Sequence, residues 1–191
     1  DLITLAKDNF INLKIDAESD YGKPIFERFR GTGYPLIIFL DTNGDELDRF
    51  YGYLPAYEFI IKMNNVLDGN NTLTDYLDKY EKGNHTAEVI KSLAYKYRDK
   101  GENKKALKLF NDLILTSDIS KEDYSNAKYL IASLNLENNA IQHMLDYLNS
   151  FEDSDDFENG VFDLVYYYKS NQMEEEELSA YTTYARKLHQ S

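Results

Sequence analysis

Residues 33–41 read Gly33-Tyr34-Pro35-Leu36-Ile37-Ile38-Phe39-Leu40-Asp41, and this stretch decides the fold expected for the N-terminal part of the chain. Five consecutive apolar residues after a proline predict a strand over 36–40 that is buried on both faces. Pro35 has no amide hydrogen for a sheet, so it is expected at the start of the strand. Asn43-Gly44 tolerates positive φ at both central positions of a two-residue hairpin turn. A second strand over 46–51 is therefore expected to pair with the first.

Further elements are expected on both sides of this hairpin. A strand is predicted over 10–15, and Pro24 suits the first turn of a helix that follows it. This helix would lead from the strand at 10–15 to a parallel strand at 36–40, which is the βα unit of an α/β layer. After the hairpin, Pro55 opens a helix whose apolar residues can face the sheet, and Asp68-Gly69-Asn70-Asn71 ends it.

The order of these pieces resembles the second half of a thioredoxin domain. The segments that carry the resemblance are Phe10–Asp16, a short helix ending at Gly31, Gly33–Asp41, Asn43–Glu46 and Phe50–Tyr53. The resemblance implies that Pro35 follows a cis peptide bond and faces the redox cysteines of the family. It also implies that the peptide groups beside Tyr34 pair with an extended substrate strand. Gly33, Tyr34 and Pro35 are therefore the candidate substrate-binding residues, and no catalytic residue is predicted.

The sequence contains no cysteine, so these 191 residues cannot perform thiol-disulfide exchange, which needs a thiolate nucleophile. The resemblance implies a Cys-x-x-Cys pair on a helix of which residues 1–7 would be only the last turns. It also implies a central strand between those at 10–15 and 36–40. Without that strand both neighbours have unpaired backbone groups. The chain is therefore expected to be a fragment that does not complete the sheet by itself.

Beyond Thr72 the sequence changes to helical patterns with short polar connections, so the predicted domains are 1–68 and 69–191. The expected fold class is α/β followed by all-α. Seven helices are expected after residue 72, at 73–82, 86–100, 103–116, 121–136, 139–151, 157–170 and 173–189.

One helical pair has the spacing of a tetratricopeptide repeat. The pattern consists of Ile90, Leu93, Ala94, Tyr97, Gly101, Ala106, Phe110 and Leu113. Small residues at positions 94 and 106 would allow close approach of the two helices, and Gly101 would permit the tight turn between them. The later pairs keep the apolar period without the alanines. They resemble degenerate repeats, and the last pair is expected to cap the stack. The resemblance implies an array that binds a protein or peptide client.

Composition excludes several classes of partner. The net charge of −13 argues against nucleic acid, and no apolar run is long enough for a membrane span. No cofactor is predicted. His85, His143 and His189 lack the spacing of a zinc site, and the acidic residues around Asn43-Gly44 lack the glycine and glutamate positions of a calcium loop.

One run of tyrosines and one run of glutamates each have two possible interpretations. Tyr166-Tyr167-Tyr168 could form a recognition patch, but adjacent residues point around a helix, which favours core packing for at least one of them. Glu174-Glu175-Glu176-Glu177 could attract a basic partner or could form the first turn of a helix, where negative charge is favourable.

Two functional hypotheses remain open. The chain is expected to be part of a thioredoxin-like thiol-disulfide oxidoreductase fused to a helical protein-binding domain. The alternative is a redox-inactive module of the same architecture that binds a protein or peptide. The sequence leaves the oligomeric state undetermined. A bacterial periplasmic or envelope location is suggested only by the general resemblance of such fusions.

Overall fold

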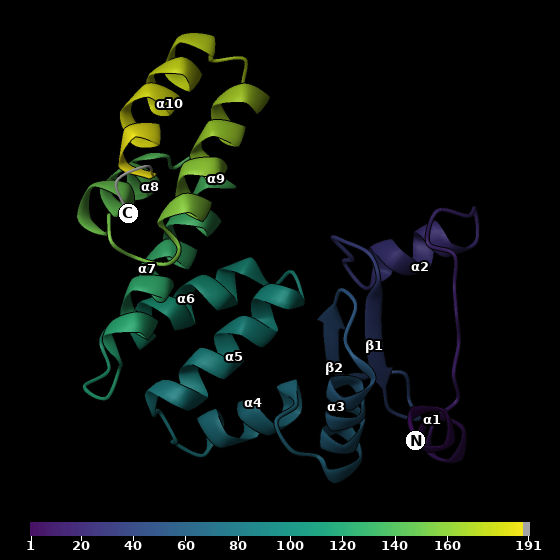
Figure 1. Ribbon diagram of the computed structural model, residues 1–191. Coiled ribbons are helices and arrows are strands. Elements are labelled where there is room, and N and C mark those ends of the chain that lie inside the picture. The colour runs from purple at the N-terminus through teal and green to yellow at the C-terminus, as the bar shows by residue number, and fades with distance from the viewer. Residues whose placement is uncertain (189–191) are drawn as a thin grey trace. The chain divides into compact units, whose positions relative to one another are not determined.

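The computed structural model describes residues 1–188 and is mainly helical, with one two-stranded antiparallel sheet near the N-terminus (Figure 1). In the described part of the chain, the sheet is followed by helices alone. The chain divides into two compact units, Asp1–Ala106 and Leu107–Ser191, and the division falls within one helix. The boundary predicted after residue 68 lies inside the first unit and stays a prediction.

In the first unit, two helices precede the β-hairpin and further helices follow it. Its elements are α1 (Leu2–Asn9), α2 (Gly22–Arg28), β1 (Leu36–Leu40), β2 (Glu46–Tyr51), α3 (Ala56–Asp68), α4 (Leu73–Glu81), α5 (Ala87–Asp99) and the start of α6 (Asn103–Leu113). The remaining elements are α7 (Lys121–Leu136), α8 (Gln142–Ser150), α9 (Phe157–Ser170) and α10 (Glu174–Leu188). All seven helices predicted after residue 72 are present, although the one expected from residue 139 begins at Gln142. The end predicted for the last helix, residue 189, lies outside the described residues.

The predicted hairpin forms, but its turn differs from the prediction. Leu36 lies opposite Tyr51 and Phe39 opposite Asp48, with a bulge before Leu40. Asp41 and Asp45 close a loop of three residues, because the Asp41 amide donates to the Asp45 carbonyl oxygen at 2.8 Å. Only Gly44 has a positive φ, of 85°. A type I turn followed by a left-handed glycine has this pattern, so the prediction of a two-residue turn was wrong.

The Asp41 carboxylate explains why the longer turn is favoured. Its Oδ1 accepts hydrogen bonds from the backbone amides of Asn43 and Asp45, at 2.8 and 2.9 Å. These hydrogen bonds lower the pKa of the Asp41 carboxyl group, the largest effect coming from the Asp45 amide. The side chain thus satisfies two backbone donors that a two-residue turn would arrange differently.

Two predictions about the sheet were wrong. The segment 10–15 forms no strand, and Ile11 and Leu13 are 94% and 81% exposed. No parallel strand order results, so the predicted βα unit is absent. The strand β1 is not buried on both faces either, because Phe39 is its single buried residue. The common reason is that β1 pairs only with β2 among the described residues, so neither its outer edge nor the segment 10–15 has a neighbouring strand.

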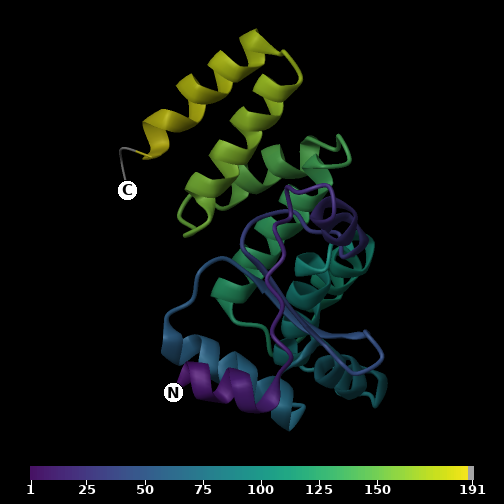
Figure 2. The same ribbon diagram turned by 90° about the vertical axis from the view of Figure 1, so that its right-hand side faces the viewer.

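One face of the hairpin is covered by α1 and α3, which lie side by side (Figure 2). Phe39, Phe50 and Met63 form the buried centre, and apolar residues of α1 pack around them. The rings of Phe39 and Phe50 lie 6.3 Å apart, and Phe59 approaches Phe50 edge-on at 5.2 Å. The helix α3 is thus positioned by its apolar face, as the sequence predicted, and Gly69 ends it with a φ of 66°.

The strand β2 also contacts α4 and α5. Lys96 on α5 donates to both carboxylate oxygens of Asp48 at 2.6 and 2.5 Å, and the two side chains are only 13% and 3% exposed. The guanidinium of Arg49 pairs with Glu46 and donates to the carbonyl oxygens of Phe29 and Asp99. Burial lowers the pKa of Arg49, but the hydrogen bonds and charge of Glu46 outweigh burial and raise it overall.

In the second unit α7, α8, α9 and α10 pack in sequential pairs around one apolar core. Its fully buried members include Met144, Leu148 and Leu164. Tyr168 is buried there, whereas Tyr166 is exposed, so the tyrosine run divides between core and surface as expected for a helix. The four glutamates 174–177 occupy the first turn of α10. Across residues 1–188, the helices lack the length and apolarity that crossing a membrane requires.

The residues of the repeat-like pattern are buried except Tyr97 and Gly101, which are half-buried. Ala94 and Ala106 are both completely buried, and Gly101 has a φ of 71° in the turn between α5 and α6. The pattern predicted small buried residues at positions 94 and 106 and a tight turn at Gly101, and these observations agree with it. That the two alanines face each other at close range stays a prediction.

Candidate functional site

The three candidate residues Gly33, Tyr34 and Pro35 lie in the segment that joins α2 to β1. The Tyr34–Pro35 peptide bond is cis, as predicted. The carbonyl oxygen of Pro35 accepts a hydrogen bond from the Gly52 amide at 2.9 Å, which continues the ladder beyond the end of β2. The segment is therefore held against the hairpin at the point where β1 begins.

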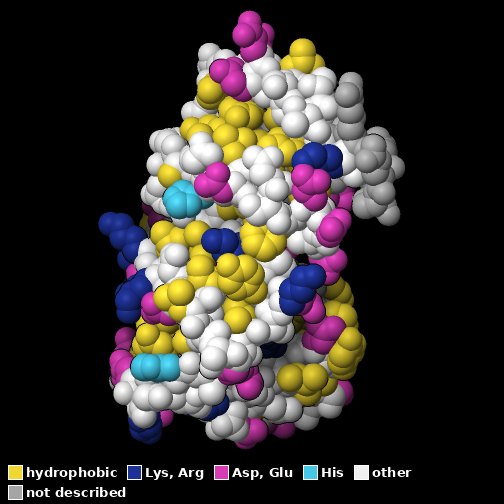
Figure 3. Space-filling model, turned by 90° about the vertical axis from the view of Figure 1, so that its left-hand side faces the viewer, with side chains coloured by type: hydrophobic (Ala, Val, Ile, Leu, Met, Phe, Trp, Pro, Cys, Tyr) yellow, Lys and Arg dark blue, Asp and Glu magenta, His cyan; other side chains and the backbone are white. Residues whose placement is uncertain are grey.

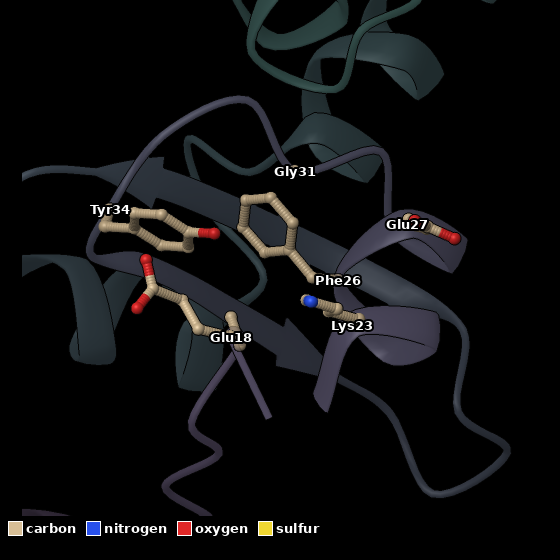
Figure 4. Close-up of a pocket in the computed structure, with 7 residues that line it drawn as sticks. Glu18, Lys23, Phe26, Glu27, Gly31 and Tyr34 are labelled. Atoms are coloured by element: carbon tan, nitrogen blue, oxygen red, sulfur yellow. The ribbon is translucent and has the colours of Figure 1, made fainter. Parts of the chain in front are cut away.

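Tyr34 projects from this segment and is 60% exposed. Its ring lies 4.9 Å from the ring of Phe26 on α2, with 31° between the ring planes. Figure 4 shows the two rings next to each other at the cavity that they line. Such a pair offers an apolar, aromatic surface that does not need a large rearrangement to meet a ligand.

The aromatic pair belongs to a wide cavity of about 600 Å³. Figure 4 shows the Glu18 carboxylate directed toward Tyr34 and the Lys23 side chain beside Phe26, while the Glu27 carboxylate points away. The lining residues are Ala17, Glu18, Lys23, Phe26, Glu27, Gly31 and Tyr34. The lining thus combines aromatic rings with charges of both signs.

Two glycines beside the cavity differ in what they require. A Cβ atom on Gly31 would lie 2.2 Å from the Phe26 ring, so only glycine lets the ring occupy its position. A Cβ atom on Gly33 would meet nothing closer than Tyr51 at 3.8 Å, an ordinary contact. Gly31 therefore shapes the cavity, whereas Gly33 is not needed there for steric reasons.

The sequence proposed Gly33, Tyr34 and Pro35, of which only Tyr34 lines the cavity, and it did not place Phe26, Glu18 and Lys23 beside Tyr34. Phe26 lies on α2, within the short helix that the sequence predicted to end at Gly31. The signal that could have located Phe26 was its spacing from Gly31, since a glycine five residues after an aromatic residue permits the ring to fold back. Glu18 and Lys23 carry no comparable signal, because isolated charges occur throughout the chain.

The charged groups that line the cavity are the carboxylates of Glu18 and Glu27 and the ammonium of Lys23. The chain has no cysteine, and the cavity lining contains no histidine, serine or threonine. Residues 1–188 hold no cluster of three or more histidine, aspartate or glutamate side chains suited to a metal ion. His85 stacks on Tyr80 with 4.5 Å between the ring centroids, and His189 lies outside the described residues.

Comparisons of this chain with protein-family models, with curated proteins and with solved structures find no match.

Proposed function

We propose that this chain is the peptide-binding part of a thioredoxin-like thiol-disulfide oxidoreductase joined to a tetratricopeptide-like helical domain that binds a protein client. The observation that carries the proposal is the exposed Tyr34 at the start of the strand β1, which pairs only with β2 among the described residues and so has an open outer edge. In this arrangement an extended client would lie along β1. The cavity beside Phe26 would receive one of its side chains.

The open edge of β1 supports a strand-like mode of binding. Unpaired amide and carbonyl groups along an edge strand form hydrogen bonds with an added strand, while side-chain pockets provide selectivity. Leu36, Ile37 and Ile38 are half-buried, so they still have apolar surface to cover. Tyr34 and Phe26 would provide the adjoining pocket. An added strand would thus satisfy the backbone groups and cover the apolar side chains at once.

The helical part supports the client-binding half of the proposal. Pairs of helices pack against each other in α4 with α5, in α7 with α8 and in α9 with α10. Stacked helical pairs of this kind form extended surfaces that bind peptides or proteins. The sequence pattern around Ala94 and Ala106 is the most specific part of this resemblance.

A redox-inactive binding module is the second candidate function, and the absence of cysteine favours it. For an oxidoreductase, the reacting thiol pair would have to lie outside these 191 residues, because exchange requires a thiolate. Both candidates use the same peptide-binding edge. They differ only in whether a thiol pair is placed against Pro35.

A binding assay tests the part that both candidates share. We expect a fluorescent, cysteine-free, extended peptide to bind the chain, and Tyr34→Ala to weaken binding by roughly tenfold, about 1.4 kcal/mol. Tyr53→Ala is the matched control, because Tyr53 is an exposed tyrosine of the same unit that does not line the cavity. Equal affinities of the two variants would exclude Tyr34 as a binding residue.

The redox question needs a different measurement. The 191-residue chain should show no insulin reduction at any pH. If the oxidoreductase proposal is right, the coding sequence that precedes Asp1 should encode a Cys-x-x-Cys pair, and the longer protein should reduce insulin. A preceding strand and helix without cysteine would leave the binding module as the function.

A further inference from the structure

A second cavity lies in the first unit between β2, α3, α4 and α5, and it shares no residue with the cavity beside Tyr34. Its volume is about 290 Å³, which corresponds to roughly ten water molecules at about 30 Å³ each. This space admits a small molecule of about the size of one amino acid. The site proposed above for an extended peptide does not use it.

The charged side chains that line this cavity are mostly basic, although the chain has a net charge of −13. Four of the five are cationic, Asp99 being the exception. Arg49 pairs with Glu46, Lys96 with Asp48, and Asp99 with Arg98. Lys62 and Lys91 are the other two cations of the lining.

Lys62 has an uncommon environment. It is half-buried on α3, yet its side-chain ammonium makes no hydrogen bond and no ion pair with any of residues 1–188. An ammonium group has three donors, and removing it partly from water without a partner is unfavourable. A negatively charged ligand would supply the missing partner.

Two further polar groups point to the same kind of ligand. The side-chain amide of Asn65 and the hydroxyl of Ser92 both line the cavity and are half-buried. Like Lys62, they have no side-chain hydrogen bond with any residue that the structure describes. Each can act as a donor, so the three groups together match the several acceptor positions of a carboxylate or phosphate.

The aromatic side chains of the cavity are held in place by their own contacts. The Tyr76 hydroxyl donates to Asn71 Oδ1 at 3.1 Å, and the Lys79 ammonium lies 5.0 Å from the centre of the Tyr76 ring. The Arg98 guanidinium lies 4.7 Å from the centre of the Tyr95 ring. Fixed rings beside the donors limit the loss of side-chain freedom when a ligand binds.

We propose that this cavity binds a small molecule through its carboxylate or phosphate group, with Lys62, Asn65 and Ser92 donating hydrogen bonds to the oxygens. Lys91 adds positive charge on the wall formed by α5. The rings of Tyr76 and Tyr95 contact the rest of the ligand. The site needs no thiol and does not involve Gly33, Tyr34 or Pro35, so it is independent of the peptide-binding proposal.

Titration of the 191-residue chain with two probes, inorganic phosphate and succinate, tests the proposal by NMR of backbone and side-chain amides. We expect at least one probe to shift the signals of Asn65 and Ser92 in a saturable way, with affinity that falls as salt concentration rises. Stronger binding of phosphate would identify a phosphate ligand. Stronger binding of succinate would identify a carboxylate ligand.

Two lysine variants separate this site from general attraction of anions. Lys62→Gln should weaken binding of the preferred probe at least tenfold, whereas Lys104→Gln should not change it. Lys104 is an exposed lysine of the same unit that does not line the cavity, and both changes remove one positive charge. The melting temperature of Lys62→Gln should match that of the unmodified chain, because Lys62 has no protein partner to lose.

Two results would overturn the proposal. One is the absence of saturable shifts at Asn65 and Ser92 with both probes. The other is equal weakening of binding by Lys62→Gln and Lys104→Gln, which would mean that the anions respond only to overall charge.

Discussion

The two compact units join their elements by different means. In Asp1–Ala106 the strand β2 is attached to helix α5 through charged groups that are almost completely buried, Asp48 with Lys96 and Arg49 with the Asp99 carbonyl oxygen. In Leu107–Ser191 an apolar core with buried tyrosines packs the helices together. Figure 3 shows one outer face of the molecule, where hydrophobic side chains (yellow) lie among charged ones. Buried ion pairs depend on one geometry, whereas apolar contacts tolerate small shifts. The first unit should therefore be the more sensitive to single charge removals, and the second to changes of volume.

The largest effect is expected from Lys96→Met, which leaves the Asp48 carboxylate buried without its partner. We expect a loss of about 3–5 kcal/mol in the free energy of unfolding, measured by urea denaturation. The double variant Asp48→Leu/Lys96→Met should be clearly more stable than Lys96→Met alone, because no charge is then left unpaired. If the double variant were as unstable as the single one, packing and not the ion pair would explain the loss.

In the second unit, the corresponding test reduces the volume of a buried side chain instead of removing a charge. Leu164 is completely buried in the core of α7 to α10, and Leu164→Ala should cost about 2–5 kcal/mol through lost burial and a residual cavity. Leu178→Ala on α10 is the control, since Leu178 is exposed and its truncation should change stability little. Similar losses for both leucines would contradict the position of this core.

Ala106→Leu tests whether the first unit also contains a contact that depends on volume. Ala106 has no exposed surface, so a larger side chain should overpack its surroundings and cost about 1–3 kcal/mol. Chemical denaturation would measure the change. An unchanged stability would show that the repeat register placing Ala106 against α5 is wrong.

Alkaline pH should lower the stability of the second unit in particular. Burial raises the pKa of the Tyr147, Tyr168 and Tyr184 phenols above the ordinary value of 10, and burial with the Asp163 charge raises the pKa of Tyr129 further. A raised pKa of a phenol means that the folded state favours the neutral form. This contribution to stability is complete below pH 10 and is lost as pH rises through the folded-state values.

Tyr129→Phe provides the control for that effect. The Tyr129 hydroxyl and the Ser133 hydroxyl both donate to Asp163 Oδ2 at 2.9 Å, so the variant removes one ionisable group and one hydrogen bond. We expect the helical signal of the variant to fall less steeply between pH 10 and 12 than that of the unmodified chain. An identical alkaline profile would show that Tyr129 does not contribute.

The smallest effect is expected at acidic pH in the hairpin turn. The pKa of Asp41 is lowered by amide hydrogen bonds, first from Asp45, so its stabilising contribution is present above the unfolded value of 3.8. It is lost as pH falls from 3.8 through the lower folded-state pKa. The NMR shifts of the Asn43 and Asp45 amides should follow this titration. Asp41→Asn should abolish that pH dependence.

Local signals explain why the helices could be predicted from the sequence. The helix α7 begins after Ser120, whose hydroxyl accepts from the Asp123 amide, and its bounds agree with the prediction. The strand predicted at 10–15 shows the limit, because a strand also needs a neighbour that the local sequence does not reveal. The pairing of Asp48 with Lys96 joins residues 48 positions apart, and neither has a local pattern that marks it. The second cavity was missed for the same reason, since its lining residues come from β2, α3, α4 and α5.

The open edge of β1 also creates a risk of aggregation. Edge strands with unpaired backbone groups and exposed apolar side chains, such as Leu40, can pair with the same edge of another copy. Between two chains of net charge −13, electrostatic repulsion opposes that encounter at neutral pH. Screening by salt, or neutralisation near the isoelectric point of about 4.6, removes this protection. Solutions of the chain should therefore stay clear longest at low ionic strength and neutral pH.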